Sequence, residues 1–282
     1  EWGMMEKGYR PMEFFWESPQ QWKLLVKNPA PLVFSGVGFL QEQAKRLCIV
    51  YHPFFQPGDF IANETGLFQL SGSLGPLLSF RQDLVPWLGH VLFFATTLYR
   101  MRETVRHYNQ NTSIIFRGII PEGPLKGALL EAMGDTGCFF WSPEFPDGIL
   151  HIELWKQLGG IPRAVERTRL KLAPNLKLLV EINNLSDGIT AMKHGADGVV
   201  LRGLRGEVTS EVTRALRERF KKAYIEYCGP VGLSNIDSFA SAGLDAISPD
   251  NIPRLLGLTQ LETVLELLPE NAGEQLQPGA EE

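Results

Sequence analysis

The sequence has no excess of basic residues and no long hydrophobic run. It contains 27 Lys and Arg residues against 32 Asp and Glu, a formal net charge of -5. A protein that binds nucleic acid or anionic lipid usually carries a cluster of positive charge, so we expect neither partner. The most apolar stretch covers residues 91–95, and Pro86, His90 and Arg100 on either side of it keep the apolar run short. Because a transmembrane helix needs about 20 apolar residues, we predict no membrane span.

Cysteine is scarce, and its spacing excludes a disulfide scaffold. Cys48, Cys138 and Cys228 lie far apart, form no Cys-x-x-Cys pair, and leave one thiol over in any pairing. This pattern is typical of a reducing compartment. The residues around Met4 and Met5 show no basic segment followed by an apolar core, so we expect no secretion signal and a cytoplasmic location.

The composition changes along the chain in a way that predicts several parts. Residues 1–30 are rich in aromatic residues and prolines and predict an irregular arm, with a short helix over 18–26 because Ser18 precedes Pro19 at a helix start. Residues 31–110 combine strand-like runs over 31–78 with helical spacing over 77–107. They predict a β-rich α+β domain with one or two long buried helices. Residues 263–282 are polar and acidic and predict a disordered tail.

Residues 111–262 alternate strand-like and helix-like segments, which is the pattern of a parallel α/β sheet. The clearest units repeat one order: an apolar strand, a short loop, a helix, and a glycine before the next strand. Gly195 and Gly243 each stand where a helix end needs a left-handed residue. A series of such units predicts either a closed barrel or a doubly wound sheet.

Two of these units resemble the quinolinate phosphoribosyltransferase family, the carboxylating nicotinate-nucleotide pyrophosphorylases. The family pattern EVEVxxLxxAxxAxxxGADxIxLDN is similar to LVEINNL at 179–185 followed by HGADGVVL at 194–201. The later pattern ExSGGIxxxNIxxxAxxGVDxIS is similar to EYCGPVGLSNI at 226–236 followed by GLDAIS at 243–248. A fainter resemblance extends upstream to about residue 31.

The resemblance implies a fold and a set of site residues. The implied fold class is α/β, of the type II phosphoribosyltransferase kind, with an α/β-barrel domain at 111–262 and a β-rich N-terminal α+β domain. The matched positions imply Arg81 and Arg117 as substrate-binding residues and Glu181 as the catalytic acid. In the family, the N-terminal part of one subunit completes the site of its neighbour, which implies a homodimer in which Arg81 serves the shared site. Magnesium is implied by the resemblance only, and the cofactor requirement stays unknown.

Several motif positions depart from the family. The family binds a pyridine dicarboxylate and a pyrophosphate, whose negative charges must be offset by arginine, lysine and a metal. Here the motif lysine is replaced by Gly118, the aspartate of LDN by Arg202, and the second glycine of the phosphate-facing SGG by Pro230, which has no N–H. We therefore expect weaker binding of the family's substrates than in the family itself.

The remaining charged candidates each have two interpretations. Arg117 is either an anchor for an anionic ligand or an arginine at the end of a strand. Glu181 either binds a metal or a ribose hydroxyl, or is a buried acid that needs a partner. Arg202 either binds a carboxylate or phosphate as a further substrate-binding residue, or forms a salt bridge with Glu181. We assign no metal ligands.

Two functions from different classes follow. The first is a divergent phosphoribosyltransferase-like enzyme that binds an anionic aromatic or phosphorylated small molecule through Arg81, Arg117, Glu181 and Arg202. The second is a catalytically inactive family member that serves as a ligand-binding or protein-interaction module. Convergence of these side chains on one cleft would favour a small-molecule site, and dispersal into unrelated salt bridges would not.

Overall fold

A computed structural model of the chain describes residues 21–117, 120, 122–123, 125–141, 148–250 and 252–268. The chain divides into two compact units. The first comprises residues 1–96, 123–132 and 257–282, and the second comprises residues 97–122 and 133–256. Two helices, α4 (Val85–Tyr108) and α5 (Lys126–Asp135), contribute residues to both units. No helix in the described part of the chain has the length and hydrophobicity that a membrane span requires.

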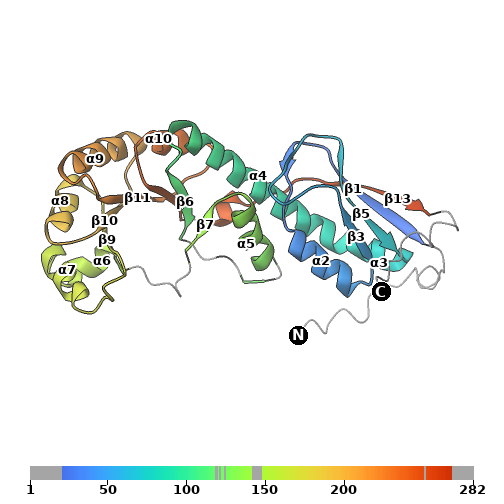
Figure 1. Cartoon of the computed structure of the whole chain (residues 1–282), viewed down its shortest axis with the longest axis horizontal. Helices are drawn as coiled ribbons and strands as arrows, with labels where there is room; N and C mark the ends of the chain where they lie inside the picture. The colour runs from blue at the N-terminus through green and yellow to red at the C-terminus, as the bar shows by residue number, and fades with distance from the viewer. Residues whose placement is uncertain are drawn as a thin grey trace, which may run out of the picture. The chain divides into compact units, whose positions relative to one another are not determined.

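The first unit is built on a four-stranded antiparallel sheet in the order β13-β1-β5-β3 (Figure 1). Its strands are β1 (Trp22–Asn28), β3 (Val50–Pro53), β5 (Thr65–Gly72) and β13 (Glu262–Leu267). The unit also contains a pair of short strands, β2 (Leu32–Val33) and β4 (Phe60–Ile61), and the helices α2 (Val37–Arg46), α3 (Leu74–Ser79) and the π-helical turn η1 (Phe80–Leu84). The expected strands occur within residues 31–78 and a long helix within 77–107, but α2 (Val37–Arg46) lies in the segment for which only strands were expected.

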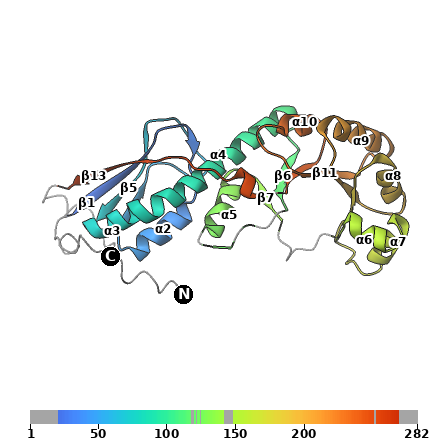
Figure 2. The ribbon, with the colours of Figure 1, turned by 180° about the vertical axis from the view of Figure 1, so that it is seen from behind.

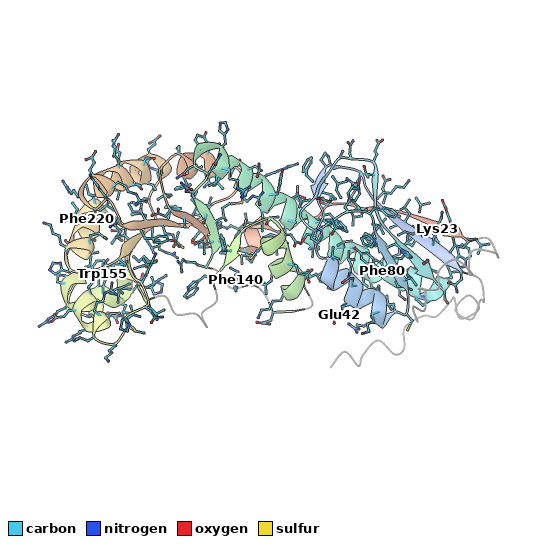
Figure 3. All side chains as sticks on the ribbon, in the orientation of Figure 1. Lys23, Glu42, Phe80, Phe140, Trp155 and Phe220 are labelled. Atoms are coloured by element: carbon cyan, nitrogen blue, oxygen red, sulfur yellow. The ribbon has the colours of Figure 1, made fainter. Side chains whose placement is uncertain are left out.

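The core of this unit lies between the sheet and the helices that follow it. Leu24 and Val26 of β1 pack with Phe68 of β5, with Phe80 of η1 and with Leu88 at the start of α4, and all five are fully buried. Figure 3 labels Phe80 within this cluster. The alternation of buried and less buried residues along β1 explains why this segment is a strand.

Two expectations for the chain ends are wrong where the structure describes them. Residues 22–28 form β1 and not part of a helix over 18–26, because β1 is hydrogen-bonded on both sides, to β5 and to β13. Pairing on both sides outweighs a local helix signal from Ser18 and Pro19. The predicted disordered tail is likewise wrong for residues 263–267, which belong to β13. Residues 1–20 and 269–282 lie outside the described residues, and the boundaries expected at 31 and 111 stay predictions.

The second unit is a seven-stranded parallel sheet in the order β7-β6-β12-β11-β10-β9-β8. Its strands are β6 (Ser113–Phe116), β7 (Phe139–Phe140), β8 (Gly148–Leu150), β9 (Leu178–Ile182), β10 (Gly198–Arg202), β11 (Tyr224–Gly229) and β12 (Ala246–Pro249). Every neighbouring pair is parallel. This is an open α/β barrel with β7 and β8 at its edges, and it confirms the expected fold class.

Helices connect these strands and cover the outside of the sheet (Figure 2). They are α6 (Ile152–Gln157), α7 (Ile161–Arg169), α8 (Leu185–Lys193), α9 (Gly206–Arg219), α10 (Ile236–Ala240) and the short 3-10 helix η2 (Ile252–Leu255). Gly195 and Gly243 both have positive φ angles, 96° and 71°, as expected for residues that end a helix before a strand.

The repeated units share one further device, an aspartate two residues after each of these glycines. Asp197 accepts the Leu178 N–H at 2.7 Å and forms an ion pair with Arg169. Asp245 accepts the Ile225 N–H at 2.7 Å and pairs with Arg217 at 2.6 Å. Each carboxylate therefore ties the start of a neighbouring strand to a helix-borne arginine, which explains why both repeats carry aspartate at this place.

Replacing Asp245 with Ala should lower the free energy of unfolding by about 1–3 kcal/mol, because the Ile225 N–H loses its acceptor. Urea unfolding followed by circular dichroism measures the change. Glu218→Gln, an exposed change on α9, is the control and should leave the midpoint in place. An unchanged midpoint for Asp245→Ala would show that this device does not support the sheet.

Candidate functional site

The strand register brings acidic and basic side chains to the same face of the parallel sheet. Glu181 of β9 pairs with Val200 of β10, and Val200 pairs in turn with Glu226 of β11. Two residues further along, Arg202 at the end of β10 pairs with Cys228 of β11. Because carboxyl ends of parallel strands meet at one edge, where α/β barrels place their sites, we define this edge as the barrel mouth.

The first part of the barrel mouth is a buried ion pair between Arg117 and Glu226. Arg117 follows β6, and its guanidinium donates two hydrogen bonds to the Glu226 carboxylate, the one from Nη2 to Oε2 measuring 2.8 Å. Glu226 also accepts from the Tyr224 hydroxyl at 3.0 Å and from the Ser248 hydroxyl at 2.6 Å. Side-chain exposure is 8% for Arg117 and 0% for Glu226. This carboxylate is therefore fully engaged by protein groups.

Two further observations fit this arrangement. Burial, reinforced by the adjacent Glu226 carboxylate, raises the pKa of Tyr224 well above its usual value, so its hydroxyl stays a donor. The Arg117 guanidinium also lies over the ring of Trp141, 5.3 Å from its centroid. Arg117 is thus held on several sides by its own chain.

The second part of the barrel mouth surrounds Glu181, whose side chain is 6% exposed. Its Oε2 accepts the Ile152 N–H at 3.1 Å and lies 3.4 Å from Nδ1 of His151. Its Oε1 lies 3.4 Å from Nε of Arg202. Trp155 of α6, labelled in Figure 3, donates to the Glu181 backbone oxygen at 2.9 Å. Glu181 therefore joins the start of α6 to the end of β10.

Arg202 is the most accessible of the arginines at the barrel mouth that these contacts join, with 43% of its side chain exposed. Beyond Glu181, it donates from Nη1 to Cys228 Sγ at 3.1 Å and lies with Nη2 3.8 Å from Oδ2 of Asp250. Burial alone would lower the pKa of Arg202. The combined effect of Cys228, Glu181 and Asp250 is larger and raises this pKa above its usual value, so the guanidinium is held in its charged form. Burial raises the pKa of the Cys228 thiol to about 11, which keeps that group neutral near pH 7.

The structure thus brings together three of the four residues predicted from the sequence. Arg117, Glu181 and Arg202 lie in the second unit at the barrel mouth, and the Arg202–Glu181 salt bridge is present as one of the two interpretations expected. Arg81 belongs to the first unit, on η1, with its side chain exposed. The described residues contain no group of three His, Cys, Asp or Glu side chains able to hold a metal ion.

Sequence reasoning missed Glu226, Ser248 and Asp250 as members of this site. For Glu226 a signal existed, since an acid inside the apolar strand Tyr224–Gly229 must find a partner by the same argument that singled out Glu181. Asp250 had no comparable signal, because an aspartate directly after a strand is common in loops.

The loop after β11 uses its backbone donors internally. The Val231 N–H bonds to the Gly229 oxygen at 2.9 Å, and the Gly232 N–H bonds to Oδ1 of Asn235 at 2.9 Å. The N–H groups of Asn235 and Ile236 both bond to the Gly232 oxygen. Since Pro230 has no N–H, the loop offers few donors for a phosphate group.

Removal of one partner from the Arg117–Glu226 pair should be costly. Glu226→Ala should lower the free energy of unfolding by about 3–5 kcal/mol, because the Arg117 guanidinium loses the carboxylate that accepts two of its hydrogen bonds. The paired replacement Arg117→Met with Glu226→Leu should recover most of that loss. Urea unfolding of the two variants tests this, and a fully stable Glu226→Ala protein would contradict it.

Comparison with known proteins matches this geometry to one family. Residues 150–254 match the model of the quinolinate phosphoribosyl transferase C-terminal domain. The human nicotinate-nucleotide pyrophosphorylase [carboxylating] is 30% identical over 90 residues, which cover 32% of this chain and 30% of that protein. The probable enzyme of Methanocaldococcus jannaschii is 23% identical over 233 residues, which cover 80% of each. The match to the human relative thus spans about a third of its length.

Solved structures extend the likeness across both units. The nicotinate-nucleotide pyrophosphorylase of Francisella tularensis has a TM-score of 0.75 at 20% identity, covering 89% of this chain and 88% of that one. NadC from Streptococcus pyogenes has a TM-score of 0.79 at 16% identity, covering 91% and 90%. At such identities these matches show the shared fold. Residues 150–254 are thus similar to the quinolinate phosphoribosyl transferase C-terminal domain, and the fold is shared with nicotinate-nucleotide pyrophosphorylases.

Proposed function

We propose that this protein binds a small anionic molecule at the barrel mouth through Arg202, and that it does not carry out magnesium-dependent phosphoribosyl transfer. The observation that carries the proposal is the position of the Arg202 guanidinium, 3.4 Å from Glu181. In the family pattern, this position on β10 is the aspartate that helps to hold magnesium.

The residues present do not fit a magnesium ion. Magnesium in enzymes is bound by one or two carboxylates together with waters and substrate phosphates. At the matched positions one carboxylate is replaced by the cation of Arg202, and the other, Glu181, already lies near Arg202, His151 and the Ile152 N–H. A second cation beside this guanidinium would be repelled. We therefore derive no step that uses a metal.

The phosphate side of the family's reaction also lacks support. The loop after β11 has Pro230 where the family pattern has glycine, and the N–H groups of Val231, Gly232, Asn235 and Ile236 bond within the loop. A pyrophosphate would need fixed donors or cations to offset its charge. Arg117 does not supply them freely, because its guanidinium makes a bidentate pair with Glu226. Both arguments favour binding over transfer.

Two observations suggest the class of ligand: the exposed part of the Arg202 side chain and the names of the related proteins. Arg202 is 43% exposed and lies at the carboxyl end of a barrel strand, so a carboxylate or phosphate can approach it from solvent. The relatives are named as nicotinate-nucleotide pyrophosphorylases, which favours a pyridine carboxylate or its nucleotide. An anionic aromatic or phosphorylated small molecule is thus the ligand class that we propose.

Nicotinate or nicotinate mononucleotide should raise the unfolding temperature of the wild-type protein, because a ligand at a hundred times its Kd stabilises the native state by about 2.7 kcal/mol. Arg202→Gln should abolish the shift. Arg205→Gln, a change of the same charge at an exposed residue three positions later, should retain it. Differential scanning fluorimetry gives all three results.

An activity assay separates binding from transfer. Phosphoribosyl pyrophosphate, quinolinate and magnesium together should release no pyrophosphate above the background rate. Magnesium-dependent release would overturn the proposal and would leave the transferase as the function. A loss of the nicotinate shift in Arg205→Gln as well as in Arg202→Gln would argue against a specific role of Arg202.

The proposal includes a homodimer, in which the exposed Arg81 on η1 serves the site of the neighbouring subunit. Analytical ultracentrifugation at micromolar concentration should give twice the chain mass of 31.6 kDa. A species of single chain mass at that concentration would remove the homodimer and the role of Arg81 from the proposal.

A further inference from the structure

Each of the three guanidinium nitrogens of Arg202 lies near a protein group, and the rest of the side chain's surface is open to solvent. Its Nε is 3.4 Å from Glu181 Oε1, its Nη1 is 3.1 Å from Cys228 Sγ, and its Nη2 is 3.8 Å from Asp250 Oδ2. Glu181 is 6% exposed and Asp250 is 30% exposed. The guanidinium thus lies between the buried carboxylate of Glu181 and the partly exposed carboxylate of Asp250.

The position of Asp250 is set by the sheet. Asp250 directly follows β12, whose last residue, Pro249, pairs with Gly229 of β11. The Asp250 N–H then donates to the Gly229 oxygen at 3.1 Å. This hydrogen bond holds the Asp250 backbone at the sheet edge beside Arg202.

The charges of the described residues around the barrel mouth are close to balanced. The segments between each strand of the parallel sheet and the following helix or strand contain the basic residues Arg117 and Arg205 and one histidine, His151. Among the described residues, the same segments contain the acids Glu122 and Asp250. The strand residues Glu181 and Glu226 are paired with Arg202 and Arg117, respectively. The composition therefore supplies no surplus of positive charge for a ligand with several negative charges.

We propose that Asp250 is a specificity residue that limits the ligand at Arg202 to a single negative charge. This inference rests on the proposed function and narrows its ligand class. One carboxylate on the exposed part of the guanidinium gains a charge-assisted contact. A second anionic group on the same small ligand lies within a few ångströms of the Asp250 carboxylate, where like charges repel in a partly desolvated site. Asp250 acts here as a repulsive element of recognition.

The experiment compares two probes that differ by one carboxylate, nicotinate and quinolinate, by isothermal titration calorimetry. Wild-type protein should bind nicotinate more tightly than quinolinate. Asp250→Asn keeps the side-chain shape and removes its charge, and it should strengthen quinolinate binding by about tenfold or more while changing nicotinate binding by about threefold or less. Glu218→Gln changes the net charge equally on an exposed part of α9 and should change neither affinity.

The outcomes distinguish this inference from the proposed function. If nicotinate binds wild-type protein and fails to bind Arg202→Gln, but Asp250→Asn gives the two probes the same affinity ratio as wild type, the role of Asp250 is wrong and the binding function stands. If neither probe binds wild type or Asp250→Asn, both proposals fail. Asp250→Ala provides a second variant: a gain for quinolinate shared by Asn and Ala supports charge removal as the cause, and a gain confined to Asn would overturn it. A thermal unfolding curve for each variant verifies that it is folded.

Discussion

The barrel mouth depends on the need of two buried carboxylates for cations. Glu226 is fully buried and Glu181 nearly so, and an unpaired carboxylate in such a place costs several kcal/mol. The chain meets this need with side chains from the same sheet: Arg117 reaches Glu226 across β12, and Arg202 reaches Glu181 from the adjacent strand β10. These two ion pairs fix the direction of both arginines. They also decide what the carboxyl edge of the sheet can still offer to a ligand.

The difference between a guanidinium and a metal ion explains why a shared fold need not mean a shared reaction. A bound metal keeps open coordination positions that polarise a substrate, and it leaves its acidic ligands as a site. A guanidinium is part of a side chain and is always charged, and its N–H groups donate hydrogen bonds to the groups around it. Arg202 is bonded to Cys228 and paired with Glu181 and Asp250, and we therefore propose that this edge holds an anion and not a Lewis acid. The likeness to nicotinate-nucleotide pyrophosphorylases shows a shared fold, and a fold alone does not establish a shared reaction.

The sequence predicted the features that repeat locally along the chain, but it did not predict pairings between residues far apart in the chain. The repeats that end in Gly195 and Gly243 predicted the parallel sheet, because helix and strand signals of this kind are local. The helix expected over 18–26 failed because residues 22–28 are paired with β5 and with β13, which lies some 240 residues away, and no local signal carries that information. The same distinction applies to the site. Arg202 and Glu181 could be paired in advance from neighbouring repeats, whereas the Arg117–Glu226 pair joins residues 109 positions apart.

That long-range pair also corrects how an arginine in a family motif is interpreted. Arg117 stands at a position that, by resemblance, holds a substrate, and in sequence nothing distinguishes it from a ligand-binding arginine. Its neighbours decide the matter: with Glu226 accepting two of its hydrogen bonds and Trp141 against its face, moving it toward a ligand would leave a fully buried carboxylate uncompensated. The cost is smaller for Arg202, because Glu181 also receives the Ile152 N–H and lies beside His151, and because part of the Arg202 guanidinium stays in solvent. Of the two arginines at this sheet edge, the less completely bonded one, Arg202, is therefore the one to which we assign recognition in the proposed function.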